Sequence, residues 1–207
     1  EREAAARQRQ FLADAAHELR TPIAILLSEA EVALRGGPDG GADRAALERI
    51  GTEARELSSL VNDLMLIARR DAHGIRPALA RVYLDDLVNL ALSRVRVLPV
   101  AAGREIRRAH FEAAPALGDA TLLERAIMVL VQNALLHAPG SPVEVSTGTA
   151  EGGWAWVTVR DWGPGIPAGA AERIFDRFSR LNVEVPGSGL GLPIARAIAE
   201  AHNGTLT

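Results

Sequence analysis

The sequence contains no cysteine, no lysine and no apolar run long enough to span a membrane. Without cysteine, the chain has no disulfide, no thiolate metal site and no cysteine nucleophile. All 23 basic residues are arginine, which excludes the phosphate-binding lysine of a Walker A loop and the nucleotide-binding lysine of eukaryotic-type protein kinases. Apolar runs fall short of the roughly 20 residues of a transmembrane helix, and the first residues, EREAAARQRQ, do not resemble a signal peptide.

The composition that remains is sufficient for a folded core. The chain has 207 residues, of which 48% are hydrophobic, and this length allows two modest domains. Its formal net charge is -3 and its isoelectric point is near 6.0, so nothing in the charge balance favours a nucleic-acid partner. Any phosphate chemistry must use groups other than lysine.

Residues 1–71 carry the spacing of two long helices. The glycine-rich stretch RGGPDGGAD, residues 35–43, is the predicted turn between them. A two-helix hairpin with one narrow apolar stripe on each helix buries that stripe poorly, so we expect two copies to pair as a four-helix bundle in a homodimer. The stripe residues recur every three or four positions: Leu12, Ala16, Leu19, Ile23, Leu26, Ala30 and Ala33, then Leu47, Ile50, Ala54, Leu57, Val61, Leu64 and Ala68.

The stretch DAHGIRPA interrupts the helical pattern, and we expect residues 72–81 to be a linker. From residue 82 to 207, short β-type runs alternate with helical runs, which is typical of an α/β sandwich. The expected fold class is therefore α+β, with a helical hairpin first and the sandwich second. The predicted strands are 105–111, 143–147 and 154–160, and the predicted helices are 84–94, 120–137 and 190–202.

A histidine and a proline stand close together in the first predicted helix, within AAHELRTPIAIL. A helix turns about 100° per residue, which puts His17 about 140° from the apolar stripe at Leu12 and only some 40° from Thr21. Pro22 lacks the N–H that would bond the carbonyl of Glu18, so we expect a bend there. Glu18 can hold one imidazole nitrogen as N–H and leave the other free to attack phosphorus; alternatively, it is an ordinary solvated residue.

The run FLADAAHELRTPI resembles the H-box of sensor histidine kinases, in which a His-Glu-x-x-Thr-Pro run lies on the first helix of a dimerisation and phosphotransfer domain. The resemblance implies that His17 accepts a phosphoryl group. It also implies a role for Thr21 in dephosphorylating a partner, because similar kinases use this position for phosphatase activity. The alternative for Thr21 is a bond from its hydroxyl to the carbonyl of His17.

Four later segments resemble the boxes of the GHKL-type ATP-binding domain of these kinases: LVQNALLHA, DWGPGIP, IFDRFSR and GSGLGLPIARAIAEAHNG. The first implies that Asn133 holds Mg²⁺ beside the phosphates, with His137 also near the nucleotide. The second places Asp161 where a carboxylate accepts the adenine amine, and Gly163 and Gly165 where the backbone passes close to the base. The third offers Arg177 and Arg180 to phosphate. The fourth opens onto a helix whose free N–H groups suit phosphate oxygens, and its expected contacts are Gly187, Gly189, Leu190 and Gly191.

Each box also has an ordinary structural interpretation. An asparagine within a helix often faces solvent, a Gly-Pro turn often follows a strand, and two phenylalanines one turn apart are often core residues. The agreement of the boxes in order is what favours the nucleotide site. The resemblance implies an ATP- and Mg²⁺-dependent kinase core, a homodimer whose partner is a response regulator receiver domain, and a cytoplasmic segment of an inner-membrane receptor anchored through a sensor region.

The sequence departs from the family pattern at two positions of the first box. Val129 stands where asparagine or glutamate is usual, and Leu136 stands where lysine is usual. The stretch from Phe178 to Gly187 is shorter than the lid that is usual in the family, and the family normally has two more strands after NGTLT. Val129 and Leu136 motivate an alternative, a dimeric signalling scaffold with weak catalysis. A GHKL ATPase that performs conformational work is disfavoured by the H-box.

Overall fold

The computed structural model describes residues 2–35, 40–167, 169–182, 185 and 187–207. The chain forms two compact units, Glu1–Ala68 and Arg69–Thr207. Residues 36–39 of the predicted turn lie outside the described residues, as do residues 183, 184 and 186 of the predicted lid.

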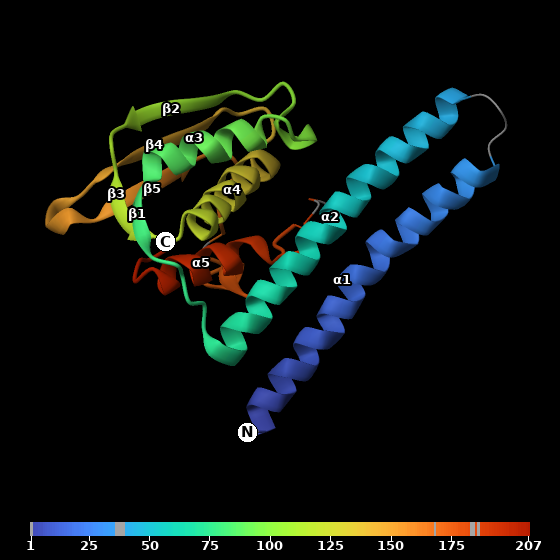
Figure 1. Ribbon diagram of the computed structural model, residues 1–207, viewed down its shortest axis with the longest axis horizontal. Coiled ribbons are helices and arrows are strands. Elements are labelled where there is room, and N and C mark those ends of the chain that lie inside the picture. The colour runs from blue at the N-terminus through green and yellow to red at the C-terminus, as the bar shows by residue number, and fades with distance from the viewer. Residues whose placement is uncertain (1, 36–39, 168, 183–184, 186) are drawn as a thin grey trace. The chain divides into compact units, whose positions relative to one another are not determined.

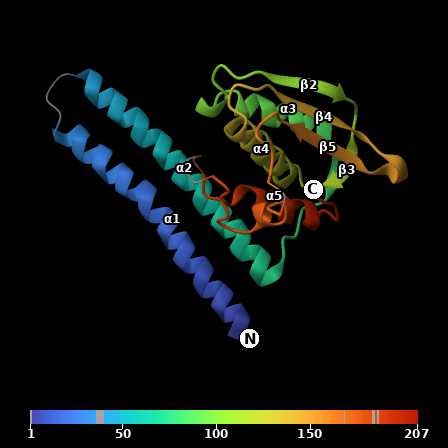
Figure 2. The ribbon, with the colours of Figure 1, turned by 180° about the vertical axis from the view of Figure 1, so that it is seen from behind.

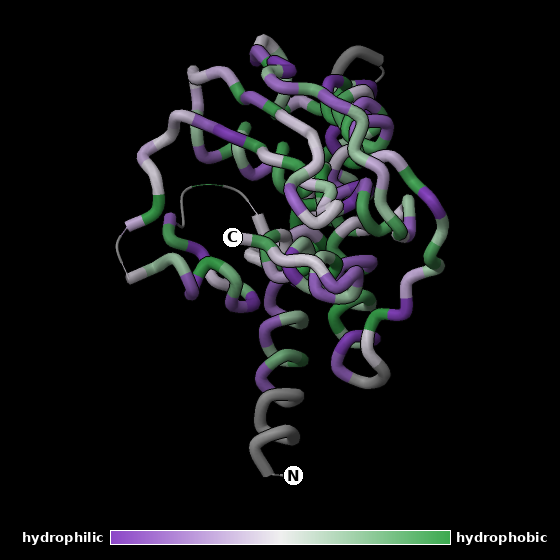
Figure 3. Tube along the Cα trace, turned by 90° about the vertical axis from the view of Figure 1, so that its left-hand side faces the viewer, coloured by the Kyte–Doolittle hydropathy of each residue, from purple (hydrophilic) through white to green (hydrophobic). Residues whose placement is uncertain are grey.

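Unit 1 is a pair of long helices, α1 (Arg2–Arg35) and α2 (Gly40–His73), and the end of α2 belongs to unit 2. Helix α1 passes Pro22 without interruption. Figure 3 shows polar and apolar positions alternating along the helix that begins at the N-terminus. The pair buries Ala15, Ala46, Leu60, Leu64 and Ile67, whereas four residues of the predicted stripe, Leu12, Ile23, Leu47 and Val61, are 40–63% exposed.

Unit 2 contains two small sheets (Figure 1). Strand β1 (Ala80–Tyr83) pairs antiparallel with β3 (Pro115–Gly118). In the second sheet β4 (Val143–Thr149) is central, parallel to β2 (Ile106–Phe111) and antiparallel to β5 (Ala155–Arg160). The sequence predicted β2, β4 and β5 to within two residues but missed β1 and β3. Strand β1 begins inside the predicted linker, and α2 ends at His73 rather than at residue 71.

Two helices, α3 (Leu84–Val95) and α4 (Ala120–His137), pack on the second sheet, and α5 (Gly191–Ala201) packs on α4. Figure 2, from behind, shows the strands in front of α3 and α4. Short 3-10 helices occupy Pro99–Ala101, Glu151–Gly153 and Arg173–Phe175. The largest fully buried side chains lie in this sandwich, including Val88, Leu135, Val145 and Ile194. The predicted fold class, two long helices followed by an α/β sandwich, is confirmed.

Asp119 fixes the start of α4. Its carboxylate accepts the N–H groups of Thr121 and Leu122 as a helix cap and that of Ala78 from the segment before β1. Its own N–H donates to Nε2 of His202, at the end of α5, over 2.9 Å. Partial burial raises the pKa of Asp119, but these N–H donors and the nearby His202 outweigh it and hold the pKa below its ordinary value. Asp119 therefore joins the predicted linker to the start of α4 through its carboxylate, and contacts the end of α5 through its backbone N–H.

Candidate functional site

The predicted phosphoacceptor group lies on α1. His17 and Thr21 are both exposed and one helical turn apart, on the face that the spacing predicted. Glu18 is half-buried beside them. Within the described part of the chain, no hydrogen bond or ion pair is formed by the imidazole of His17. Both ring nitrogens are therefore open to an incoming reactant.

Helix α4 brings the predicted nucleotide residues of unit 2 together. Asn133 is half-buried and His137, one turn later, is exposed at the end of the helix. Val129, one turn before Asn133, packs against the start of α5: a Cβ added to Gly191 would lie 3.1 Å from Cγ1 of Val129. The start of α5, whose N–H groups were predicted to hold phosphate, is therefore close to the asparagine side of α4.

The turn after β5 rests on the other end of α4. A Cβ at Gly163 would lie 2.8 Å from the carbonyl oxygen of His137, so only glycine fits there. The N–H of Gly163 donates to Oδ1 of the exposed Asp161 over 2.8 Å. This bond fixes the carboxylate and leaves its second oxygen for another donor. Gly165 adopts a φ of 73°, which favours glycine.

Gly189 joins the segment IFDRFSR to the start of α5. The N–H of Phe178 donates to the carbonyl of Gly189 over 3.0 Å, and a Cβ on Gly189 would lie 2.7 Å from the Phe178 carbonyl carbon. Phe178 has a φ of 59°, a left-handed conformation that is rare outside glycine. Gly187 has a φ of 145°, and Leu190 is fully buried, so any phosphate contact of Leu190 must come from its backbone.

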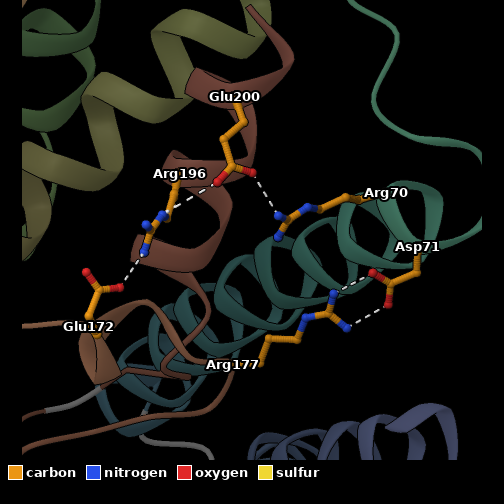
Figure 4. Close-up of polar contacts among 6 residues, drawn as sticks. All are labelled: Arg70, Asp71, Glu172, Arg177, Arg196 and Glu200. Atoms are coloured by element: carbon orange, nitrogen blue, oxygen red, sulfur yellow. Dashed lines mark hydrogen bonds and ion pairs between the residues drawn. The ribbon is translucent and has the colours of Figure 1, made fainter. Parts of the chain in front are cut away.

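The predicted phosphate arginines already have partners in this structure. Arg177 donates from both terminal nitrogens to the carboxylate of Asp71 over 2.6 and 2.5 Å, as Figure 4 shows. Arg180 donates to the carbonyl of Val185. Asp71 is in the last turn of α2, within unit 2. The sequence did not point to Asp71, because a carboxylate in a helix end gives no signal of a partner 106 residues away.

A second charged cluster lies beside that pair (Figure 4). Glu200 of α5 pairs with Arg70 over 2.8 Å and with Arg196 over 3.5 Å. Arg196 also pairs with Glu172 and stacks on Phe175, with its guanidinium carbon 4.6 Å from the ring centroid. These residues line a cavity of about 290 Å³. Its lining contains none of the predicted nucleotide residues, and its Arg70 and Arg196 are paired with carboxylates.

Two further findings bear on cofactors and on membranes. In the described ranges, no cluster of three or more histidine, aspartate or glutamate side chains is placed to hold a metal ion. Asn133 is the predicted Mg²⁺ ligand, and a single amide ligand suits this ion only when phosphate oxygens and water complete its shell. Among the helices that the structure describes, none has both the length and the apolar character to cross a membrane.

Two family models match the chain. Residues 7–73 match the His Kinase A (phospho-acceptor) domain, and residues 118–207 match the histidine kinase-, DNA gyrase B- and HSP90-like ATPase. The chain is 38% identical over 206 residues to the probable sensor histidine kinase TcrY of Mycobacterium tuberculosis, covering 96% of this chain and 42% of that protein. It is 38% identical over 212 residues to the sensor protein CutS of Streptomyces coelicolor, covering 97% and 49%.

Solved structures agree with these matches. The mycobacterial sensor histidine kinase MprB is 30% identical, with a TM-score of 0.55 over 61% of this chain and 81% of that chain. The Acinetobacter baumannii histidine kinase AdeS, 22% identical, shares the fold with a TM-score of 0.70 over 89% of this chain and 86% of that chain. The chain spans about half the length of the curated relatives it matches.

Proposed function

This chain belongs to the sensor histidine kinases of two-component systems, and on that premise we propose that it transfers the γ-phosphoryl group of ATP to His17. The observation that carries the proposal is the convergence on α4 of two glycine segments, one at Gly163 against His137 and one at Gly191 against Val129. The chain also presents an exposed histidine on a separate helix. A nucleotide site and a nucleophile on separate units are what a phosphotransfer between them needs.

Unit 2 supplies the groups that hold ATP. The free oxygen of Asp161 accepts the adenine amine, while Gly163 and Gly165 let the backbone approach the base. Phosphate oxygens lie at the N-terminus of α5, approached through Gly187, Gly189 and Gly191, where free N–H groups and the helix dipole favour negative charge. Arg177 and Arg180 add positive charge, and His137 borders the base side. Mg²⁺, held by Asn133, neutralises phosphate charge when bound.

The chemistry at His17 needs alignment and charge neutralisation more than covalent help. The unprotonated imidazole nitrogen donates its electron pair to the γ-phosphorus, and the bond to the bridging oxygen breaks, so ADP leaves with that electron pair. The ring becomes cationic as the N–P bond forms. Glu18 stabilises this charge and takes the proton from the other ring nitrogen.

The partners follow from the same chemistry. We propose that phosphohistidine passes its phosphoryl group to an aspartate of a response regulator receiver domain, and that the chain acts as a homodimer through the exposed apolar residues of unit 1. We further propose that the 207-residue chain is the cytoplasmic part of a receptor anchored in the inner membrane. The relatives' length beyond the matched part supports this.

The test is incubation of the chain with γ-labelled ATP and Mg²⁺, followed by acid or base treatment of the labelled protein. We expect label that is lost in acid and retained in base, as for a phosphoramidate. His17→Gln should take up no label while ATP affinity, measured by calorimetry, is unchanged. Label on the His17→Gln protein would move the acceptor to another residue and overturn the assignment.

Glu18 and Thr21 separate two activities on one helix face. Glu18→Ala should slow autophosphorylation, because it removes the group that orients and deprotonates the ring. Thr21→Ala should leave autophosphorylation intact and slow dephosphorylation of the regulator, because its hydroxyl orients the attacking water. Equal phosphatase rates for Thr21→Ala and the unmodified chain would assign the hydroxyl a structural bond to the carbonyl of His17.

A second candidate function, a dimeric scaffold with weak catalysis, is favoured by Val129. This side chain packs against Gly191 and offers no ligand to Mg²⁺ or phosphate. ATP affinity and turnover with Mg²⁺ separate the two candidates. Tight binding with negligible turnover would favour the scaffold.

A further inference from the structure

Arg104 carries a charge that lies outside all the nucleotide motifs. It follows the 3-10 helix Pro99–Ala101 and precedes β2, and it is half-buried. Its side-chain hydrogen bonds go to three backbone carbonyls: Nη1 donates to Leu135 over 2.6 Å, and Nη2 donates to Ala138 over 2.5 Å and to Ser141 over 3.0 Å. Partly burying a guanidinium without a carboxylate partner is costly, and the three carbonyls offset that cost.

The three acceptors belong to the C-terminal end of α4 and the turn that follows it. The last carbonyls of a helix have no partner within the helix, and a cation there also opposes the negative end of the helix dipole. A guanidinium has donors in a rigid planar fork, so it fixes the directions of several acceptors at once. Arg104 therefore sets both the position of the end of α4 and the path of the chain to Ser141.

The same end of α4 supports the turn that carries Asp161. A Cβ on Gly163 would lie 2.8 Å from the His137 carbonyl oxygen and 3.2 Å from the Ala138 Cβ. The hydroxyl of Ser141 lies 3.5 Å from the carbonyl oxygen of Trp162. Gly163 in turn holds Oδ1 of Asp161. A contiguous set of contacts thus runs from Arg104, through the residues it binds, to the carboxylate.

We infer that Arg104 is a positioning residue for adenine recognition: by clamping the end of α4, it places the free oxygen of Asp161 for the exocyclic amine of the base. This inference rests on the proposed function. It goes beyond it because Arg104 itself touches no nucleotide and is 57 positions from Asp161 in the sequence. A misplaced carboxylate loses affinity for a base that carries the amine and not for one that lacks it.

The test compares binding of ADP and inosine diphosphate, whose hypoxanthine base lacks the amine, by calorimetry on the full chain. The unmodified chain should prefer ADP by on the order of tenfold, the effect of one hydrogen bond to a charged group. Arg104→Gln should lose most of this preference by weakening ADP alone, and Arg104→Lys, which keeps the charge without the fork, should lose part of it. Arg107→Gln is the matched control, because Arg107 pairs with Glu105 at the surface, and it should keep the preference.

A double-mutant cycle distinguishes positioning from general stabilisation. In an Asp161→Asn background, Arg104→Lys should have no further effect on the ADP preference, because the group it positions is gone. Circular dichroism tests whether each variant is folded. If Arg104→Gln is unfolded, the comparison uses Arg104→Lys alone. If Arg104→Lys weakens binding of ADP and inosine diphosphate equally, or lowers the melting temperature while the preference for ADP is retained, the inference about Arg104 is wrong and the proposed function stands. An unmodified chain that shows no preference would overturn both the adenine site and the role of Arg104.

Discussion

In unit 1 the large apolar side chains of Leu12, Leu47 and Val61 are 40–63% exposed, whereas in unit 2 Val88, Leu135 and Ile194 are at most 1% exposed. Unit 2 closes one core between a sheet and helices α3 and α4 and packs α5 on α4, so its apolar residues have partners on several elements. A helical hairpin offers each residue a neighbour on only one other helix. Unit 2 therefore buries a core of its own, whereas the helical pair leaves large apolar side chains exposed along its length, which supports the proposed dimer.

The largest expected effect is loss of the proposed dimer when a charge is placed on the exposed apolar surface of unit 1. Val61→Asp should convert the dimer to a monomer, because the charge would be buried without a partner in the interface. Ser59→Asp, at an exposed position two residues earlier, is the matched control and should leave the dimer intact. Light scattering measures both. A monomeric unmodified chain, or a Val61→Asp variant that stays dimeric, would contradict the comparison.

A glycine-to-alanine substitution should change the free energy of unfolding in opposite directions in the two units. Gly189→Ala places a Cβ 2.7 Å from backbone atoms of Phe178 at a φ of 68°, and should lower the free energy of unfolding by about 2–4 kcal/mol. Gly51→Ala, inside α2 with only the end of the Arg55 side chain 3.6 Å away, should raise it by about 0.5–1 kcal/mol.

Urea unfolding measures these free energies, and Gly153→Ala is the control. Gly153 has a φ of 79° but no atom near an added Cβ, so its variant has the backbone strain without the clash. If Gly189→Ala costs no more than Gly153→Ala, the close approach of Phe178 contributes nothing.

A smaller effect, on ATP affinity, is expected from Asp71, which lies at the end of α2 and belongs to unit 2. Asp71→Asn should weaken the ion pair with Arg177 and raise ATP affinity by about two- to fivefold, the range for a partly exposed ion pair. Glu200→Gln is the control: it breaks the pairs with Arg70 and Arg196 and leaves Asp71 on Arg177. Unchanged affinity in Asp71→Asn, measured by calorimetry, would remove Arg177 from the phosphate site.

The sequence predicted those parts of the fold that local chemistry determines. Helix α4 begins and ends where it was predicted, because Asp119 caps an apolar periodic run and Pro139 disfavours the helical conformation at Ala138. Strands β1 and β3 were missed, since four residues are too few for a period of two to be recognised and β1 begins where the chain reads as a linker. Pairing with each other, rather than their own sequences, makes them strands.

The candidate site divides in the same way. Gly163 and Gly189 were found from their motifs, and the structure gives the contacts that require glycine there. The bonds of Arg104 to α4 and of Asp71 to Arg177 join residues 31–37 and 106 positions apart. Such contacts depend on the packing of whole elements, and a single sequence carries no local signal for them.

The smallest expected effect is a pH dependence of opposite sign in the two units. In unit 1, burial and then the charge of Glu56 raise the pKa of Glu53, so its ionisation opposes folding at neutral pH and protonation relieves the cost. In unit 2 the pKa of Asp119 is lowered, so its contribution is present at neutral pH and is lost as the pH falls below the ordinary carboxyl range, through its folded value.

Two isosteric variants measure each contribution by urea unfolding between pH 7 and pH 3. Glu53→Gln should be more stable than the unmodified chain at pH 7 and equal to it at pH 3, and Glu56→Gln should reproduce part of that gain because it removes the second cause. Asp119→Asn keeps an oxygen for Thr121 and Leu122 but not the charge, so it should be less stable at pH 7 by up to about 1 kcal/mol. Its difference from the unmodified chain should shrink toward pH 3. The direction in which each stability difference changes with pH depends on whether the folded pKa of the carboxyl lies above or below its unfolded pKa. If both differences change in the same direction between pH 7 and pH 3, the pKa values of Glu53 and Asp119 are not shifted in opposite directions.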